Sequence, residues 1–501
     1  MIFTPITNTN EKKDKQFFKE LINIYIDFVN KYRKKYNLKD SIKIFDCTDE
    51  LINIGVIEQK KDITDLKDFL GNKTFQKFIE SVCFYKENKN DLKNILYKLS
   101  NTERLKLQQK KELANEPTLI DLFCGAGGLS LGFIQNNFKI ELANDIEEVC
   151  INTYKYNHPD TPSKKIILGD LKKIVDNIDQ FVSKDIDVII GGPPCQGFSS
   201  ANQQRIIDDP RNQLYKYFLK AVEKIAPKFV VMENVRGMLK VADQVIEDFK
   251  KVKSSKNNID YHYTVSYKLL NSKDFGVAQS RERLIYIAIR NDIVDKKNIS
   301  PKSLFEEIEL NCKKIDSFNL SDALEFIKPL EAQREKNKNE IDSDISGKKI
   351  DINEFGNNND YLSLINMNRS IPFIFNHKAR YVSDLNYEIY RRLDPGDDAT
   401  NEKISDIMPY SHRNHIFKDK YFKLIPDKPC RTITAHLRMD CHSHIHPYQI
   451  RSITPREAAR IQSFPDDYFF LGAYLKTYMQ IGNAVPPLMS RGISSVIKKY
   501  L

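Results

Sequence analysis

The sequence predicts an α/β protein built on a doubly wound, mostly parallel sheet, with a smaller second domain and a helical N-terminal extension. From Pro117 onward, short apolar segments alternate with helical stretches, which is the pattern of strands joined by crossover helices. The distinctive residues directly follow those segments, at the carboxyl ends of strands, where such sheets bind ligands. Residues 1–115 instead show a helical period and contain almost no glycine.

Length and composition narrow the class of protein. The 501 residues exceed one ordinary core, so we expect two or three domains. A hydrophobic fraction of 41% and a charged fraction of 29% are typical of soluble globular chains. No apolar run approaches the roughly 20 residues of a membrane span, and the start lacks the basic-then-apolar order of a secretory signal. Eight cysteines without a CxxC pair indicate reduced thiols, so we expect a cytoplasmic protein.

The first 115 residues are expected to form a helical appendage. Apolar side chains recur at three- and four-residue steps in "FFKELINIYIDFVNKYRKKY", which gives a helix one apolar face. These positions are Phe18, Leu21, Ile22, Tyr25 and Phe28. The segment carries no chemical motif, so we expect it to pack on the main body or on a partner.

Apolar segments expected to form the first five strands lie at 118–123, 139–145, 164–170, 186–192 and 229–235. Helical stretches separate them, and a sixth apolar strand is expected after "QSRER". Because the carboxyl ends of parallel strands meet at one edge of a sheet, the residues that follow them are expected to share one site.

A glycine-rich turn follows the first strand. Gly125, Gly127 and Gly128 permit a tight turn and a close approach of a ligand to the backbone. Asp145 ends the second strand and Asp170 ends the third, and acids at such positions can accept hydrogen bonds from ribose hydroxyls. The combination predicts a cofactor that carries adenosine. The glycine spacing is not GxGxxG, which makes a dinucleotide less favoured.

The fourth strand ends on "GGPPC", which places Cys195 behind two prolines. The prolines remove backbone donors and fix φ, so they end the strand and hold the next residue in one orientation. A thiol held at this edge of the sheet is placed as a nucleophile would be. A free thiol with a pKa near ~8.5 still needs activation, which helix-start amides or a nearby arginine could supply.

Two more groups of polar residues lie next to apolar strands. Glu233 follows an apolar run, and a carboxyl that is partly desolvated at a cleft is a candidate proton donor. Gln279, Arg281 and Arg283 precede the next apolar strand, and the alternation places both arginines on one face. That arrangement suits an anion or a polarised carbonyl, although surface arginines are the plainer alternative.

The rest of the chain predicts a second domain and a return to the first. Residues 295–428 are rich in Lys, Asn, Asp and Ile with weak periodicity, which indicates long polar loops. Order returns in 429–501, where Thr454 is expected to cap a helix that begins at Pro455. This part is expected to complete the domain formed by 116–294.

Six motifs, read in order, resemble those of the DNA (cytosine-5)-methyltransferases of the bacterial restriction–modification type. They are "DLFCGAGGLSLGF", "GGPPCQGFS", "MENV", "QSRERL", "TPREAARIQSFPDDY" and "GNAVPP". The resemblance covers about 117–292 and 428–500, and implies the fold of S-adenosylmethionine-dependent methyltransferases. Residues 295–428 occupy the position of the family's target-recognition domain.

The resemblance implies methyl transfer from S-adenosylmethionine to carbon 5 of cytosine in a specific sequence of double-stranded DNA. Cys195 would add to carbon 6, Glu233 would protonate or hydrogen-bond ring nitrogen 3, and Arg283 together with Arg281 would contact the carbonyl oxygen. The cytosine has to leave the duplex stack for this attack. The family also implies protection of host DNA from a cognate restriction endonuclease, and we expect a monomer.

The cofactor site implied by the same resemblance consists of Phe123, Gly125, Gly127, Asp145, Ile146, Asp170, Leu171 and Asn483. Ile146 departs from the family pattern, because relatives often carry a larger side chain against the adenine. The departure puts that stacking contact in question and leaves the site in place.

The stretch "DCHSHIHP" at 440–447 suggests a metal site as an alternative. Two-residue steps would put His442, His444 and His446 on one strand face, where they could bind zinc together with Cys441. The segment needs no metal in the resembling family, and we predict none.

Two other functions stay open from the sequence. An RNA cytosine methyltransferase could use the same scaffold, but such relatives have compact recognition regions, whereas 295–428 is long. A non-enzymatic DNA-binding or regulatory protein could retain the fold, but the presence of both Cys195 and Glu233 argues against it. The net charge of +10 is compatible with a nucleic-acid partner without requiring one, and DNA binding would place the protein at the nucleoid.

Overall fold

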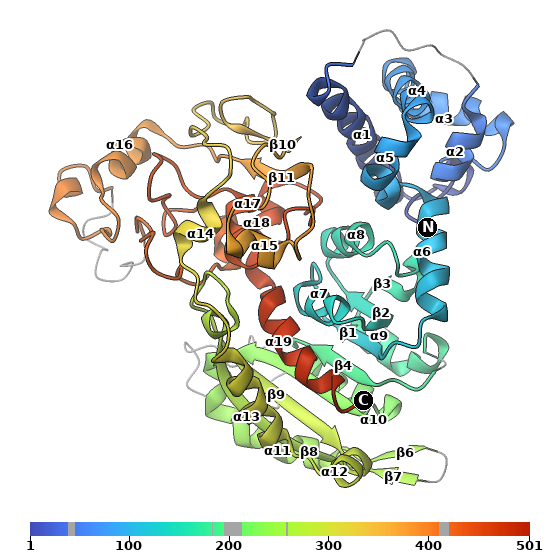
Figure 1. Cartoon of the computed structure of the whole chain (residues 1–501), viewed down its shortest axis with the longest axis vertical. Helices are drawn as coiled ribbons and strands as arrows, with labels where there is room; N and C mark the ends of the chain where they lie inside the picture. The colour runs from blue at the N-terminus through green and yellow to red at the C-terminus, as the bar shows by residue number, and fades with distance from the viewer. Residues whose placement is uncertain (39–45, 183, 195–212, 257–258, 410–419) are drawn as a thin grey trace. The chain divides into compact units, whose positions relative to one another are not determined.

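The chain is described from a computed structural model of its 501 residues (Figure 1). The described residues are 1–38, 46–182, 184–194, 213–256, 259–409 and 420–501. They cluster into two compact units. The first unit comprises Met1–Asn115, Asn152–Ile166 and Ile350–Ile352. The second unit comprises Glu116–Ile151, Ile167–Lys349 and Asn353–Leu501.

The first 115 residues are helical where they are described, as predicted. Their α-helices are α1 (Lys12–Lys35), α2 (Thr48–Ile54), α3 (Ile63–Leu70), α4 (Asn72–Glu87), α5 (Lys89–Leu96) and α6 (Asn101–Leu113). All five apolar positions predicted for α1 are buried, and each contributes roughly 1.5–3 kcal/mol by leaving water. α2 ends at Gly55, whose φ of +96° suits glycine, and Ser100 caps α6 by accepting from the Glu103 N–H at 3.3 Å.

A seven-stranded sheet forms the centre of the second unit, in the order β3-β2-β1-β4-β5-β9-β8. The strands are β1 (Thr118–Leu122), β2 (Lys139–Asp145), β3 (Ile166–Leu168), β4 (Val188–Gly191), β5 (Phe229–Val235), β8 (Tyr263–Asn271) and β9 (Glu282–Arg290). β1 pairs in parallel with β2 and β4, and β4 pairs in parallel with β5. β9 runs antiparallel to both β5 and β8. The predicted doubly wound, mostly parallel sheet is therefore confirmed.

Helices cover both faces of this sheet (Figure 1). On one face, α9 (Leu171–Asp176), α10 (Gln213–Ile225) and α11 (Ala242–Lys251) share a core with alternate residues of the strands. α7 (Gly128–Gln135) and α13 (Pro301–Cys312) contact the strands but take no part in that core, and α19 (Pro487–Lys498) packs on both of them. The central strands, covered on both sides, are accordingly mostly apolar, with Asp121 of β1 and Asn234 of β5 as buried polar exceptions.

The C-terminal segment closes against the first helix of the sheet. The Ser490 and Ser494 hydroxyls donate to the carbonyl oxygens of Leu129 and Gly132 in α7. A Cβ at Gly132 would lie 2.3 Å from the Arg491 nitrogen, so only glycine allows α7 and α19 to approach this closely. The end of the chain therefore packs on the helix that follows β1.

The remaining elements surround the sheet or belong to the polar part of the chain. They are α8 (Glu148–Asn157), β6 (Ser254–Lys256), β7 (Ile259–Tyr261), α12 (Asn291–Lys297), α14 (Leu320–Leu324), β10 (Gly347–Ile352), α15 (Asp360–Ile365), β11 (Phe373–Lys378), α16 (Asp384–Arg392), α17 (Pro455–Ile461) and α18 (Tyr474–Asn483). α17 begins as predicted, with a capping box between Thr454 and Glu457. Within the described ranges, no helix combines the length and apolar character needed to cross a membrane.

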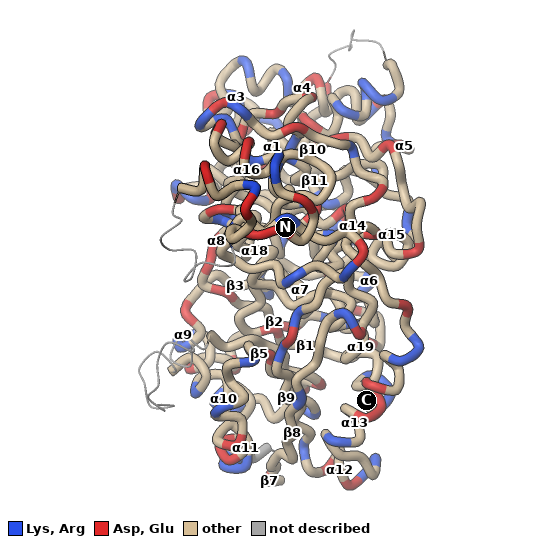
Figure 2. Tube along the Cα trace, turned by 90° about the vertical axis from the view of Figure 1, so that its left-hand side faces the viewer, with Lys and Arg blue, Asp and Glu red and all other residues tan. Residues whose placement is uncertain are grey.

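The charges of the chain are mixed along its length. Figure 2 shows Asp and Glu interspersed with Lys and Arg along the trace. The net charge of +10 is therefore spread over many segments, and it does not by itself mark a binding face. The class of substrate therefore has to be inferred from the residues and geometry of a binding site.

Candidate active site

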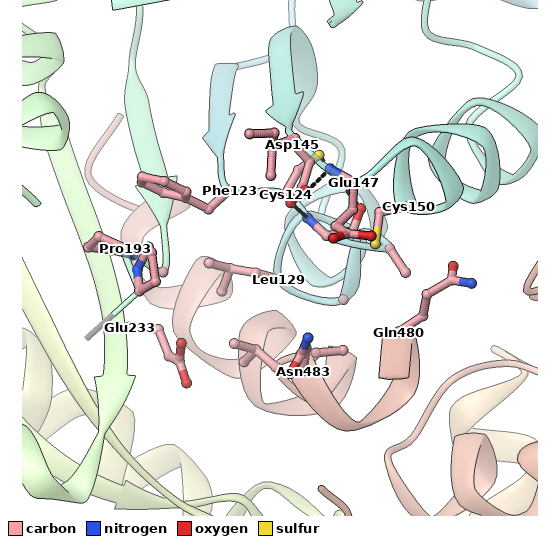
Figure 3. Close-up of a pocket in the computed structure, with 18 of the residues that line it drawn as sticks. Phe123, Cys124, Leu129, Asp145, Glu147, Cys150, Pro193, Glu233, Gln480 and Asn483 are labelled. Atoms are coloured by element: carbon pink, nitrogen blue, oxygen red, sulfur yellow. Dashed lines mark hydrogen bonds between the residues drawn. The ribbon is translucent and has the colours of Figure 1, made fainter. Parts of the chain in front are cut away.

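A cavity of about 600 Å³ opens at the carboxyl ends of the central strands (Figure 3). Ten of the eleven described residues predicted for the site line it. They are Phe123, Gly125, Asp145, Ile146, Asp170, Leu171, Glu233, Arg281, Arg283 and Asn483. The eleventh, Gly127, lies one residue before α7 and forms its N-cap. Residues far apart in the sequence thus meet in one cavity, as strand ends in a parallel sheet should.

The glycine turn has the backbone conformation that its sequence requires. Gly125 and Gly127 have φ values of +52° and +91°, which glycine adopts without strain. Phe123 also has a positive φ, of +61°, at the point where the chain leaves β1. The Tyr468 hydroxyl donates to the Ala126 carbonyl and so holds the turn from the C-terminal segment.

Asp145 fixes the turn to the end of β2. Its Oδ2 accepts from the Gly125 N–H at 2.8 Å, and its Oδ1 accepts from the Glu147 N–H at 2.8 Å. Burial raises the pKa of Asp145 above its usual value. Each carboxylate oxygen has a second lone pair, so the group keeps the capacity to accept hydrogen bonds from a ligand.

The other wall of this part of the cavity combines an acid with apolar side chains. Asp170 caps α9, because its Oδ1 accepts from the Lys172 N–H at 3.0 Å. Leu171 is buried beside it, whereas Ile146 is 71% exposed on the cavity wall. Asn483 enters from the end of α18 (Figure 3).

Glu233 and Arg283 form an ion pair at the opposite end of the cavity from Cys150 and Gln480 (Figure 3). The Arg283 Nε lies 2.7 Å from Oε1 of Glu233, and both side chains are only 13–14% exposed. Adjacent strands position them, since Val235 of β5 pairs with Arg283 of β9.

Arg281 lines the cavity and binds two backbone segments that lie beside it. Its Nη1 donates to the Ile433 carbonyl at 2.6 Å and its Nη2 donates to the Gly482 carbonyl at 3.0 Å. The side chain is 2% exposed, and burial lowers the pKa of Arg281 below its usual value. Gln279 acts alongside, because its Oε1 accepts from the Ile433 N–H at 2.7 Å. The guanidinium of Arg281 therefore joins β9 to the segment that carries Asn483.

Cys195 and the Ser-, Asn- and Gln-rich run behind it lie outside the described residues. The two prolines before it line the cavity. The Pro193 carbonyl accepts from the Asn234 side-chain amide at 3.1 Å, which ties the chain after β4 to the end of β5. Pro194, the last described residue before Cys195, thus lines the cavity that contains Glu233.

The cavity is also lined by residues that were not predicted from the sequence. Glu147 and Gln480 line it, and so does Cys150, whose pKa burial raises above its usual value. Gln480 could have been found, because it stands three residues before Asn483 on one helix and so shares its face. Cys150 could not have been found this way, because a cysteine on a helix is most often an ordinary core residue.

The histidines of 440–447 have protein partners. The Nδ1 of His442 lies 2.7 Å from the Tyr390 hydroxyl, and the Nδ1 of His446 accepts from two backbone N–H groups at 3.1 Å. Burial lowers the pKa of His442 to about 4 and that of His446 to about 3. Across the part of the chain that the structure describes, no three His, Cys, Asp or Glu side chains gather as metal ligands.

The protein combines a doubly wound α/β sheet with a single cavity that holds a glycine turn, acids near strand ends and a Glu–Arg ion pair. Residues 118–499 match the family model described as C-5 cytosine-specific DNA methylase. The chain therefore belongs to this family and is a DNA cytosine-5 methyltransferase. Residues 1–117 lie outside the match.

Individual relatives agree with this assignment. Type II methyltransferase M.DdeI of Desulfomicrobium norvegicum is 31% identical over 407 residues, which cover 76% of this chain and 88% of the relative. Type II methyltransferase M1.HphI of Haemophilus parahaemolyticus is 32% identical, with 76% and 87% covered. A crystal structure of a DNA modification methyltransferase encoded within an E. coli prophage shares 26% identity at a TM-score of 0.56, covering 77% of this chain and 99% of that one. The predicted family, a restriction–modification cytosine-5 methyltransferase, is confirmed.

Proposed function

We propose that this chain transfers a methyl group from S-adenosylmethionine to carbon 5 of a cytosine in a specific sequence of double-stranded DNA, through a covalent bond to Cys195. The observation that carries the proposal is the Glu233–Arg283 pair, which shares one cavity with the prolines leading into Cys195 and with the glycine turn. A proton donor, a thiol and a cofactor pocket are the parts this reaction needs.

The residues of the cavity fit S-adenosylmethionine, which supplies the methyl group when bound. Asp145 and Asp170 offer carboxylate oxygens for ribose hydroxyls and for the adenine amine. Ile146 and Leu171 offer apolar surface for the adenine ring, and the Asn483 amide can hold the carboxylate or amine of the methionine part. Ile146 presents less surface than an aromatic side chain would.

The chain's own residues would prepare the cytosine. The Cys195 thiolate adds to carbon 6, and the displaced electron pair is drawn into the ring, where Glu233 protonates or hydrogen-bonds nitrogen 3. Arg283 holds Glu233 and contacts the carbonyl oxygen, while Arg281 keeps the surrounding segments in place. Carbon 5 thereby becomes nucleophilic and takes the methyl group. Water then takes up the carbon-5 proton, the electron pair of that C–H bond expels Cys195 as a thiolate, and nitrogen 3 returns its proton to Glu233, which restores the aromatic ring.

This reaction also has consequences for how the enzyme binds DNA and for its role in the cell. Attack on the face of the ring requires the cytosine to leave the duplex and enter the cavity. Residues 295–428 would form the target-recognition domain, between the parts 116–294 and 429–501 of the catalytic domain. Methylation would protect host DNA from a cognate restriction endonuclease, and the enzyme would act as a monomer associated with the nucleoid.

A duplex that contains 5-fluorocytosine tests the covalent step. Fluorine cannot leave carbon 5 as a proton does, so we expect the wild-type enzyme with S-adenosylmethionine to form a denaturation-resistant adduct on this DNA. Cys195→Ala should form none, and omission of S-adenosylmethionine should reduce the yield. Absence of an adduct in a preparation that methylates ordinary DNA would overturn the covalent mechanism, and absence of any methylated cytosine would overturn the proposed function.

A further inference from the structure

We propose that Arg438 and Met439 contact the DNA bases beside the target cytosine and set part of the sequence preference of the enzyme. The inference rests on the function proposed above. It is carried by one turn, Thr434–Asp440, which includes the short helix η12 (Ala435–Arg438). Four observations support it: exposure of the tip, a rigid anchor, its place beside the cavity, and its chemistry.

The turn exposes its tip and buries its centre. Met439 is 70% exposed, and Arg438 is exposed beside it, whereas Leu437 is 1% exposed. A single exposed apolar side chain is common on protein surfaces, so exposure alone does not mark a contact site. The buried Leu437 shows, however, that the turn is folded onto the protein and presents the next two side chains outward.

A half-buried arginine holds the backbone of this tip. Arg380, which follows β11, donates through Nη1 to the Leu437 carbonyl at 2.8 Å and through Nη2 to the Met439 carbonyl at 2.6 Å. The same Nη2 also reaches the Arg438 carbonyl at 3.3 Å, and the Cys441 thiol donates to the Leu437 carbonyl at 3.2 Å. A backbone fixed in this way loses little further entropy on binding, which favours specific recognition by the side chains that it carries.

The turn lies against the element that closes the cavity. A Cβ at Gly482 in α18 would lie 2.3 Å from the Ala435 nitrogen, so this glycine permits the close approach. The Arg438 Nη1 is 3.8 Å from the sulfur of Met479, and Met479 lines the cavity. The turn that carries Arg438 and Met439 therefore lies beside a wall of the cavity that would receive the cytosine.

Both side chains are of types that recognise DNA bases in protein–DNA complexes. Arginine pairs with O6 and N7 of guanine through two N–H groups, and an apolar side chain can contact the thymine methyl group or enter a base step. Arg438 could instead contact only phosphates, which would give affinity without sequence information. Replacement by lysine separates these roles, because lysine keeps the charge and loses the planar two-pronged donor.

The test measures methylation of a DNA library whose bases around the target cytosine are randomised. The proteins are wild type, Arg438→Ala, Arg438→Lys, Met439→Ala and, as a matched control, Met367→Ala, which removes another exposed methionine. We expect Arg438→Ala and Met439→Ala each to reduce discrimination at one or two flanking positions by about tenfold, the loss typical of a direct base contact. Arg438→Lys should keep its affinity for DNA and lose the preference, and Met367→Ala should match wild type.

Three outcomes would overturn the inference. The first is wild-type sequence preference in both alanine variants, and the second is an equal loss of activity at every site, as expected for a phosphate contact. The third is restoration of the preference by Arg438→Lys. Thermal unfolding of each variant identifies a loss caused by misfolding. Failure of the wild-type enzyme to methylate any library member would instead overturn the proposed function.

Discussion

At the residue scale, burial sets the charge state of Asp121 in β1. This carboxyl is 1% exposed, and burial raises its pKa to about 8. The folded protein therefore holds a proton that the unfolded chain releases above about pH 4. This group's contribution makes the unfolding free energy fall as the pH rises from about 4 toward 8.

Asp121→Asn removes that proton equilibrium and nearly preserves the shape. We expect the variant to gain stability relative to wild type as the pH rises from 5 to 8, because only wild type then has to keep a buried acid protonated. Urea unfolding of both proteins across this pH range measures the difference, which cancels contributions from other groups. Two curves that run parallel would show that the carboxyl titrates alike in the folded and unfolded states.

Replacement of Glu233 tests the proposed proton transfer directly. Glu233→Gln keeps the volume of the side chain but cannot deliver a proton, so kcat should fall by roughly 10²- to 10⁴-fold. DNA binding, measured by gel shift, should change little. Glu282→Gln provides the control, because Glu282 begins the same strand as Arg283 and pairs at the surface with Arg236. Wild-type kcat in Glu233→Gln would remove this residue from the mechanism.

The sequence predicts site residues where chemistry and strand ends coincide. Asp145 ends β2, Asp170 follows β3 and Glu233 lies near the end of β5, and the sheet order brings them to one edge. The role of Arg281 could not be predicted in the same way. Its partners, Ile433 and Gly482, stand more than 150 residues away in the chain, and no local pattern indicates such a pairing.

At the scale of elements, the end of β4 depends on two neighbouring glycines with different surroundings. A Cβ at Gly192 would lie 2.9 Å from Oε2 of Glu233, the movable end of a side chain. A Cβ at Gly191 would lie 2.5 Å from the Leu122 carbonyl, which is fixed backbone of the adjacent strand. The two alanine variants should therefore fail in different ways.

Gly192→Ala should displace the Glu233 carboxylate and lower kcat by roughly 10- to 100-fold with little loss of stability. Gly191→Ala should separate β4 from β1 and lower the unfolding free energy by about 1–3 kcal/mol. Methyl-transfer assays and urea unfolding on both variants check the pair. Equal destabilisation with equal activity would show that the end of β4 adapts to either side chain.

Elements with strong periodicity could be predicted, and those held by distant polar contacts could not. α1 and the strands of the sheet follow from local apolar patterns. In the polar part of the chain, Arg369 forms an ion pair with Asp467, and the Asn376 amide donates to the Phe470 carbonyl. Such contacts order segments whose own sequences show only weak periodicity, so their elements had to be seen in the structure.

At the scale of the whole molecule, none of the described residues of the first unit lines the cavity. Every lining residue belongs to the second unit, and the family match begins only at residue 118. The first unit nevertheless includes residues 152–166, which lie within that match. Arg104 of α6 is fully buried and donates to the Lys155 carbonyl at 2.7 Å, so part of the catalytic sequence folds with the N-terminal helices.

Deletion of residues 1–115 should therefore lower the stability of the enzyme and leave its catalytic reaction intact. The truncated enzyme should lose the partners of residues 152–166 and unfold at a lower temperature, because buried groups such as Tyr154 and the Lys155 carbonyl would meet water. Below that temperature it should still form the 5-fluorocytosine adduct and keep the wild-type sequence preference, since the cavity lining is intact. Arg104→Ala in the full-length chain, which removes the same contact while retaining the helices, should lower the unfolding temperature and leave activity unchanged. A truncated protein that is folded by circular dichroism but forms no adduct would show that the N-terminal helices take part in catalysis.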